Sequence, residues 1–275
     1  MVQIKVLLEN FSVNNKYKTK HGLSILIEYN EKKILLDVGP DGRFTKNADI
    51  MGIDLSKIPE LYLSHNHNDH TGGLNEFVKI NNTAAIFLMD DINNKYYVKL
   101  FFLPIFVGLK LKKEYYSRIT QIKNDQNIDN KIFFLKNSIN ENTKPTFNKK
   151  LFKKENGRMV QDKFDHEGIL VLDDNNELLI FNSCSHNGIL NIIETVKNKI
   201  PNKKIRSYIG GLHLSNPNTK QHENNEYLDN IINMIKMSNI NIYTGHCSGK
   251  YVINYFKEKL GNSIHEINTG MELSV

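Results

Sequence analysis

The order of apolar and polar positions predicts strands over most of the first ninety residues. Residues 1–9 (MVQIKVLLE) alternate as a first strand does, and GLSILIEYN and KKILLDVG are apolar runs joined near Asn30-Glu31, which predicts a hairpin. The run LYLS leads into a segment rich in histidine, LSHNHNDHTGG. After it, GGLNEFVKI has helical spacing and AAIFLMD predicts another buried strand.

A second group of elements begins near residue 168. GILVLDD and ELLIFNS predict a second hairpin that ends just before Cys184-Ser185-His186, and the helix GILNIIETVKNKI is stopped by Pro201. A strand (IRSYIGG), a helix (NNEYLDNIINMIKM), a strand (INIYTGH) and a last helix (GKYVINYFKEKL) follow. Two similar halves of this kind predict one α/β domain over residues 1–275, with a sheet-on-sheet core and helices outside.

The segment between these groups, residues 93–163, has a different pattern. Its apolar run Leu100–Leu109 is broken by Pro104 and flanked by lysines, and it is shorter than the roughly 20 apolar residues that span a bilayer. Two interpretations stay open: a helix that caps a pocket, or peripheral membrane contact by residues 96–113. Residues 124–156 are polar and predict loops around the short strand KIFFL. We therefore interpret 93–163 as an insertion or lid.

Charge is concentrated in the same segment. The whole chain has a net charge of +6, and residues 93–163 hold 16 of the 36 Lys and Arg but only 6 of the 30 Asp and Glu. A locally basic surface favours an anionic small molecule, a nucleic acid or an anionic membrane as partner. The alternative is a solvated lysine-rich face, which the many Asn and Lys residues make equally plausible.

Two further features concern the cellular compartment. The N-terminal pattern lacks the basic start, apolar run and small-residue cleavage site of a secretion signal, so we expect a cytoplasmic protein. Cys184 and Cys247 are the only cysteines, too few for a disulfide framework, and we expect both to be reduced and buried. Each precedes or follows a histidine of interest, but adjacent strand residues point to opposite faces, which disfavours thiolate ligation of a metal.

The histidine-rich segment carries the chemistry. His65, His67, Asp69 and His70 place four ligand types within six residues, and alternation at the end of a strand directs His65 and His67 to the same side. Gly72-Gly73 permits a tight bend into the next helix. Three imidazoles and a carboxylate so close together suit a borderline cation such as zinc. A solvated polar turn is a poor alternative for this spacing.

The motif SHNHNDHTGGL resembles the His-x-His-x-Asp-His signature of the metallo-β-lactamase superfamily. LLDVG, CSHNGI and TGHCSG resemble further motifs of that superfamily, and HGLSILIE, GGLHL and DKFDHEGILV resemble one subgroup. That subgroup contains the dihydropterin ribofuranosylaminobenzene 5′-phosphate synthases and many metal-dependent hydrolases. The resemblance implies an αββα sandwich with the 93–163 segment inserted in it.

The resemblance also implies a ligand set and a cofactor. His65, His67 and His186 would hold one divalent ion, Asp69, His70 and His246 would hold a second, and Asp37 would orient the metal loop from outside the ligand set. A histidine at position 67, where redox di-iron members have glutamate, favours zinc over a redox centre, with manganese or iron as alternatives. One or two ions are expected.

One departure from the family pattern affects catalysis. Many hydrolases of the family place a bridging aspartate between the third and last motifs, and this chain has His213 at that place. We expect His213 to act as ligand, acid/base or substrate contact, and Asp69 to share in catalysis. The remaining predicted second-sphere or substrate contacts are His21, His166, Glu167 and Arg206.

These features lead to three functional hypotheses. The first is a hydrolase that uses a metal-bound hydroxide on a small anionic substrate such as a phosphate ester, with Arg206 and the basic segment holding the anion. The second is a transferase like the dihydropterin synthase of the subgroup. The third is a nuclease, which is disfavoured because no aromatic-and-basic nucleic-acid module is present. The sequence makes no prediction of the oligomeric state.

Overall fold

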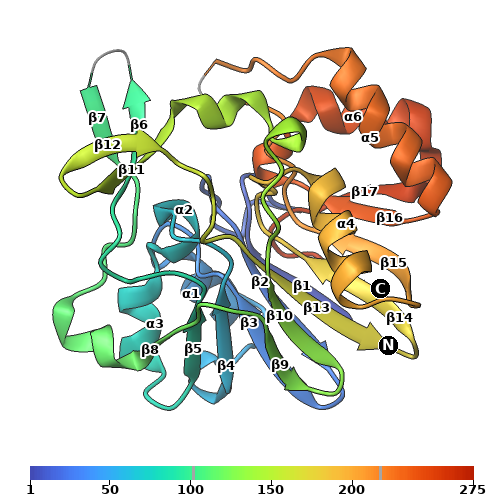
Figure 1. Ribbon diagram of the computed structural model, residues 1–275. Coiled ribbons are helices and arrows are strands. Elements are labelled where there is room, and N and C mark those ends of the chain that lie inside the picture. The colour runs from blue at the N-terminus through green and yellow to red at the C-terminus, as the bar shows by residue number, and fades with distance from the viewer. Residues whose placement is uncertain (101–102, 217–218) are drawn as a thin grey trace. The chain divides into compact units, whose positions relative to one another are not determined.

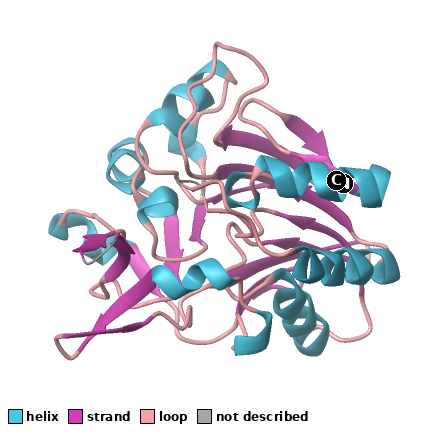
Figure 2. Cartoon of the chain, turned by 90° about the horizontal axis from the view of Figure 1, so that it is seen from above, coloured by secondary structure: helices cyan, strands magenta, loops and turns pink. Residues whose placement is uncertain are grey.

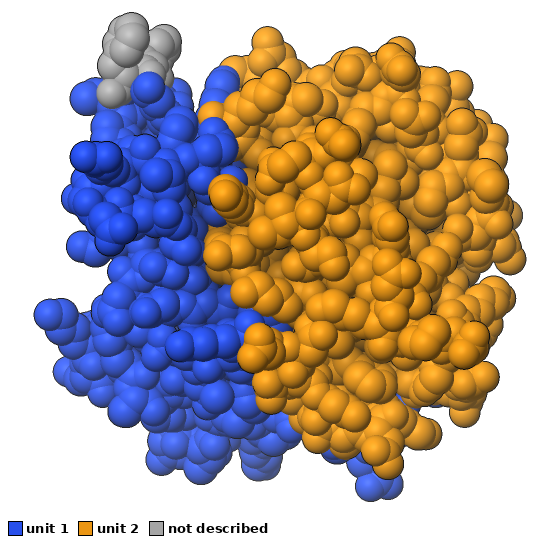
Figure 3. All heavy atoms as spheres, viewed as in Figure 1, with its two compact units in different colours: residues 1–123, 150–162, 267–275 blue, residues 124–149, 163–266 orange. Residues whose placement is uncertain are grey.

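The computed structural model describes residues 1–100, 103–216 and 219–275. Helices and strands are mixed along the chain, as Figure 2 shows, which agrees with the predicted α/β class. The chain divides into two compact units, coloured in Figure 3. Unit 1 consists of residues 1–123, 150–162 and 267–275, and unit 2 consists of residues 124–149 and 163–266.

Unit 1 is built on a mixed sheet. Its strands lie in the order β18 (Glu272–Ser274), β1 (Gln3–Leu8), β2 (Ser24–Tyr29), β3 (Lys32–Leu36), β4 (Glu60–Leu63), β5 (Ala85–Leu88) and β8 (Ile119–Gln121). The helices of the unit are α1 (Arg43–Ile50), α2 (Asn68–Thr71) and α3 (Leu74–Ile80), with the 3-10 turns η1 (Leu55–Lys57) and η2 (Lys113–Arg118). Side chains of these strands and of α1 and α3 form one apolar core, including Leu35, Leu61 and Phe77.

A small antiparallel sheet also belongs to unit 1. Its order is β12 (Arg158–Gln161), β11 (Leu151–Glu155), β6 (Tyr96–Leu100) and β7 (Leu103–Phe106). The capping helix predicted within residues 100–109 is therefore wrong for the described part of that run, because β7 pairs antiparallel with β6. Pro104 fits this arrangement, since β7 is the last strand of the sheet and an edge strand tolerates a missing N–H donor.

Unit 2 holds the second large sheet, whose order is β17 (Ile264–Glu266), β16 (Asn241–Thr244), β15 (Lys204–Ile209), β14 (Glu177–Phe181), β13 (Gly168–Asp174), β10 (Ile132–Lys136) and β9 (Gln126–Asp129). Helices α4 (Ile189–Lys199), α5 (Asn225–Ser238) and α6 (Lys250–Leu260) pack on it through a common core that includes Ile192, Ile232 and Phe256 (Figure 1). Short 3-10 turns complete the unit: η3 (Glu141–Thr143), η4 (Thr146–Lys150), η5 (His246–Ser248) and η6 (Gly261–Ser263).

Both predicted hairpins are present, β2–β3 and β13–β14. Each turns on two residues with positive φ, Asn30-Glu31 and Asn175-Asn176, which is the backbone of a type I′ turn. The predicted segment 93–163 is distributed among three sheets, because β8 joins the large sheet of unit 1 while β9 and β10 join that of unit 2. Its action as a lid stays a prediction.

The parallel strands of each unit determine where the candidate functional residues lie. In unit 1, β3 and β4 run parallel, and in unit 2, β14, β15 and β16 do. The carboxyl ends of parallel strands lie at one edge of a sheet, so the residues that follow these strands are neighbours within each unit.

Candidate metal centre

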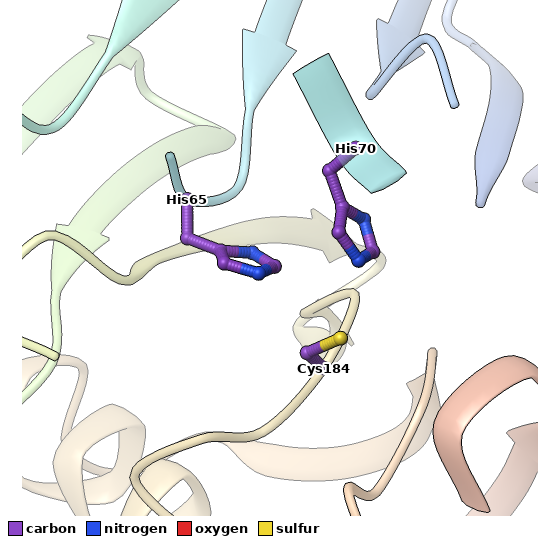
Figure 4. A group of neighbouring side chains, drawn as sticks. All are labelled: His65, His70 and Cys184. Atoms are coloured by element: carbon purple, nitrogen blue, oxygen red, sulfur yellow. The ribbon is translucent and has the colours of Figure 1, made fainter. Parts of the chain in front are cut away.

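The histidine-rich segment lies in unit 1, where the chain leaves β4 and enters α2. His65 belongs to the loop after β4 and His70 to α2, as Figure 4 shows, while His67 occupies the N-cap position of α2. All three side chains are buried. The His65 and His70 ring centroids are 4.4 Å apart, and those of His65 and His67 are 4.7 Å apart. Unit 1 thus brings three predicted ligands together.

The donor atoms of two of these rings are spaced as cation ligands are. Nε2 of His65 lies 3.1 Å from Nδ1 of His67. Two imidazole nitrogens at about 2.1 Å from a tetrahedral zinc ion would lie about 3.4 Å apart. A small rotation of either ring would reach that spacing, so the donor set fits a divalent ion of this kind.

Asp37 fixes the orientation of this cluster. It follows β3 with a φ of 57°, and its buried carboxylate accepts hydrogen bonds from the Ser64 amide (2.8 Å) and the Ser64 hydroxyl (2.7 Å). The same carboxylate is 2.8 Å from Nδ1 of His70. A carboxylate on Nδ1 holds the proton there and leaves Nε2 as the donor atom toward a metal. Asp37 therefore links Ser64 to His70, and its role in orienting the metal loop stays a prediction.

Asp69 and His21 lie beside the same cluster. The Asp69 carboxylate is 3.5 Å from Nε2 of His70 and 3.5 Å from Nε2 of His21, and both Asp69 and His21 are partly exposed. Burial alone lowers the pKa of His70, but the carboxylates of Asp69 and Asp37 outweigh burial and raise that pKa to about 10. Surroundings that stabilise a positive charge this strongly on a buried ring also favour a bound cation.

Two glycines let the motif loop pack against its neighbours. A Cβ on Gly72 would lie 2.2 Å from the Pro40 carbonyl oxygen, and one on Gly73 would lie 2.3 Å from that of Val38. The loop is also held by the Asn68 amide, which donates to the Val107 carbonyl at 2.6 Å. Sequence reasoning assigned the glycines to a tight bend, and the structure adds that close backbone contact excludes a side chain at both.

In unit 2, His186 follows β14 and is held from several sides. Its Nδ1 is 3.0 Å from Oδ1 of Asn148, its ring stacks on Phe164 with centroids 4.3 Å apart, and the His213 ring centroid is 4.1 Å away. Sequence reasoning missed Asn148, which lies in the polar stretch read as loop, and Phe164, whose segment was noted only for its subgroup resemblance. Neither position carried a chemical signal of its own.

Glu167 holds the loop that carries His186. Its carboxylate accepts hydrogen bonds from the amides of His186 (2.7 Å) and Asn187 (3.0 Å) and from the Asn187 and Asn137 side chains. His166 is buried next to it, with its ring centroid 5.8 Å from that of Phe164. Glu167 thus contacts the backbone of His186 and not its ring, and its predicted part in the site stays a prediction.

His213 and His246 follow β15 and β16. Both have a left-handed backbone, with φ of 51° and 53°, and Ser185 next to His186 has 55°. Strained backbone of this kind costs about 1–3 kcal/mol per residue and collects at functional sites. The two ring nitrogens of His213 are buried and have no hydrogen-bond partner among the described residues. This is an uncommon state for an imidazole unless a ligand completes it.

The two cysteines lie beside His213, which the sequence did not predict. Sγ of Cys184 and Sγ of Cys247 are 3.5 Å apart, and the His213 amide donates to Sγ of Cys247 at 3.2 Å. Both are buried and are not joined by a disulfide, as expected. Burial raises the pKa of the Cys247 thiol, but the Cys184 hydrogen bond and the nearby His246 and His213 outweigh it and hold that pKa well below its usual range.

Arg206 lies elsewhere in unit 2. It is on β15, before the carboxyl end of that strand, and its guanidinium donates to Asp174 at 2.9 Å and to Glu177 at 3.5 Å. These ion pairs tie β15 to the β13–β14 hairpin. They favour a structural role for Arg206 over the predicted contact with a substrate anion.

Of the predicted ligands, His65, His67, Asp69 and His70 thus form one group in unit 1, whereas His186 and His246 belong to unit 2. Their joint assignment to the same ions stays a prediction. Among the described residues, none of the helices has both the length and the apolar character that a bilayer crossing requires.

Comparison with known proteins agrees with these local features. A sequence model of the metallo-beta-lactamase superfamily matches residues 18–95, which include the motif loop. The 7,8-dihydropterin-6-methyl-4-(β-D-ribofuranosyl)-aminobenzene-5′-phosphate synthase of Methanocaldococcus jannaschii is 30% identical over 286 residues, covering 98% of this chain and 95% of that protein. An uncharacterised protein of the same organism is 26% identical over 252 residues, 90% of each chain.

The fold has a solved counterpart of similar size. A metal-dependent hydrolase of the beta-lactamase superfamily superimposes with a TM-score of 0.83 at 26% identity, over 100% of this chain and 99% of that one. The α/β fold class and the family resemblance predicted from the sequence are therefore confirmed.

Proposed function

The chain belongs to the metallo-beta-lactamase superfamily. From this premise we propose that it is a metal-dependent hydrolase that binds zinc or a similar divalent ion and acts on a small anionic substrate. One observation carries the proposal: His65, His67 and His70 converge as buried donors, with Asp37 orienting His70. Burying several imidazoles and a carboxylate together costs free energy, and a bound cation would offset that cost.

The proposed ligand set follows the family motifs. His65, His67 and His186 would hold one ion, and Asp69, His70 and His246 would hold a second. When bound, such an ion lowers the pKa of a coordinated water to about 7 and so supplies hydroxide at neutral pH. The solved hydrolase that superimposes on this chain is consistent with this chemistry.

The chain's own residues then have separate tasks. Asp37 keeps the proton of His70 on Nδ1, and Glu167 fixes the backbone of the loop that carries His186. His21, beside Asp69 and partly exposed, is placed to contact substrate or to pass a proton to Asp69. The lysines of residues 93–163 attract the anion, since Arg206 is engaged with Asp174 and Glu177.

The test is metal content together with turnover of a generic phosphodiester, bis(p-nitrophenyl) phosphate. Purified protein is expected to contain divalent metal by mass spectrometry, to lose turnover on dialysis against a chelator and to regain it with zinc or manganese. His67→Ala is expected to lose at least about a hundredfold in turnover. His222→Ala is the matched control, because that ring stacks on Tyr251 and is not one of the proposed ligands. Metal-free protein with full turnover would refute the proposal.

A second candidate is supported by the synthase relative, which matches nearly the whole chain. In that case the protein would join the 6-methyl carbon of a dihydropterin that bears a leaving group there to the amine of a ribofuranosylaminobenzene phosphate, with release of the leaving group and of one amine proton. Incubation of metal-loaded protein with both compounds and mass-spectrometric detection of the condensed product would favour it. Phosphodiester turnover without that product favours the hydrolase.

A further inference from the structure

The sulfurs of the chain's two cysteines and the imidazole of His213 lie together in unit 2. One ligand atom of each can be chosen so that all three lie within 4.8 Å of one another. They come from different segments, the loop after β14, the loop after β15 and the turn η5, so the fold of one unit assembles them. Figure 4 shows Cys184 in the first of these loops.

The spacing of the sulfurs fits a shared cation. Sγ of Cys184 and Sγ of Cys247 are 3.5 Å apart. Two thiolates at about 2.3 Å from a tetrahedral zinc ion lie about 3.8 Å apart, whereas a disulfide requires about 2.05 Å. The sulfurs therefore need only a small displacement to share an ion and a much larger one to form a bond.

His213 supplies the independent observation. Both of its ring nitrogens are buried without a hydrogen-bond partner among the described residues, which costs about 1–3 kcal/mol for each group left unsatisfied. The cost is removed if one nitrogen binds a cation. The left-handed backbone of His213, with φ of 51°, is a second cost that its position imposes.

The surrounding backbone makes room for a sulfur and donates to it. The His213 amide points at Sγ of Cys247 from 3.2 Å, which suits a sulfur carrying negative charge. Gly211 is part of the same pocket, because a Cβ there would lie 2.5 Å from Sγ of Cys247 and 2.6 Å from the Ser183 carbonyl oxygen. A side chain at 211 would displace the sulfur.

We propose that Cys184, Cys247 and His213 form a binding site for a thiophilic divalent cation such as zinc, with two thiolate sulfurs and one imidazole nitrogen as ligands. Both thiol protons pass to solvent on binding, so the ion and its two thiolates are neutral together. Three protein ligands leave a fourth position open for water or another donor. The site is formed within unit 2 and does not depend on the proposed hydrolase activity.

Cobalt(II) spectroscopy of the full-length, chelator-treated and reduced protein tests the site. We use His65→Ala/His67→Ala as background, because it removes the imidazole pair of unit 1. The expected result is a thiolate-to-cobalt charge-transfer band in the near ultraviolet that saturates at one equivalent per chain. Absence of that band in the reduced protein would overturn the proposal.

Single substitutions in the same background assign the ligands. Cys184→Ser and Cys247→Ser are each expected to weaken the band or abolish it, and His213→Ala to weaken cobalt binding by at least about tenfold. Ser183→Ala is the matched control, since its buried hydroxyl is next to Cys184 and has no hydrogen-bond partner among the described residues. An equal loss in Ser183→Ala would contradict the assignment.

X-ray absorption of the zinc-loaded protein with both cysteines intact avoids any folding defect of the cysteine variants. Sulfur scatterers at about 2.3 Å from zinc support the site, and a shell of nitrogen and oxygen alone overturns it. The two proposals fail separately. Turnover without sulfur ligation leaves only the hydrolase standing, and sulfur ligation without turnover leaves only the cysteine site.

Discussion

At the scale of single residues, Asp37 shows how one side chain outside the ligand set organises a motif. Its carboxylate bonds both the Ser64 amide and the ring of His70, so it links the end of β4 to α2. The family motif predicted this residue. The sequence did not reveal its left-handed φ of 57°, because nothing in a residue's identity reports the backbone that its neighbours impose.

Asp37→Asn is expected to weaken divalent metal binding by about 10–100-fold, because an amide no longer holds the proton of His70 on Nδ1. Competition with a chromophoric chelator measures this affinity. Asp41→Asn is the control, since Asp41 bonds Lys20 and Arg43 outside the histidine cluster. Equal affinity in Asp37→Asn and the unchanged protein would show that Asp37 only supports the fold.

Gly72→Ala is expected to destabilise the protein by about 1–3 kcal/mol, since its Cβ would meet the Pro40 carbonyl at 2.2 Å. Thermal unfolding measures the loss. Gly42→Ala is the matched control, because there the nearest atom is Cγ of the flexible Glu76 side chain at 3.1 Å. Similar melting temperatures for both variants would contradict the steric argument.

At the scale of elements, the hairpins follow closely from the sequence. Tyr29 pairs with Lys32 across β2 and β3, which leaves Asn30-Glu31 as a two-residue turn with φ of 49° and 64°. Asn tolerates this region, and Glu does so at a cost of about 1–2 kcal/mol. The turn therefore contains one favourable and one unfavourable residue.

Glu31→Gly is expected to raise the free energy of unfolding by up to about 1 kcal/mol, because Asn-Gly is a preferred type I′ pair. Chemical denaturation measures the gain. Glu31→Ala keeps the Cβ and the strain, so it is expected to give no such gain. Equal stabilisation by Gly and Ala would point to loss of the Glu31 charge as the cause.

Elements were predictable where local pattern and packing agree. The periodicity of residues 189–199 and the stop at Pro201 yield α4, and its buried side chains lie on the sheet of unit 2 as that spacing requires. The pattern around Pro104 was ambiguous, because a short apolar run does not distinguish a strand from a helix. In the structure Leu103–Phe106 is a strand because it pairs with β6.

The candidate site was predictable only in part, because a sequence pattern reveals ligands that are close in sequence and not those that the fold brings together. Ligands that are close in sequence, such as His65 and His67, can be recognised from their spacing. Cys184 and Cys247 are 63 residues apart, and only the parallel arrangement of β14, β15 and β16 brings their sulfurs together. The rule that adjacent strand residues point apart did not apply, because both cysteines lie in turns after their strands.

At the scale of the whole molecule, unit 1 is discontinuous in sequence and depends on the last residues of the chain. Residues 267–275 return to it, β18 pairs with β1, and the Thr269 hydroxyl accepts from the Glu9 amide at 2.7 Å. This tail also carries backbone bonds from Thr269 and Gly270 to Phe11 and Val6. The N-terminal strand is therefore stabilised by the C-terminal one.

Deletion of residues 267–275 is expected to lower the melting temperature by several degrees or more, because it removes the β1–β18 ladder and leaves the Glu9 amide without its acceptor. Limited proteolysis should then cut first near residues 9–20. Deletion of Val275 alone removes its two backbone bonds to Val2 but leaves β18 itself, Glu272–Ser274, in place, and is the control. A full deletion as stable as this control would contradict the dependence.

The pairing of β1 with β18 has a consequence for the chain while it is being made. Gln3 pairs with Ser274 at a separation of 271 residues, so β1 is synthesised long before its partner β18. Every strand of unit 2 is synthesised in that interval. Until residues 272–274 are synthesised, β1 therefore presents a backbone edge without its β18 partner, and an exposed edge of this kind favours pairing between chains.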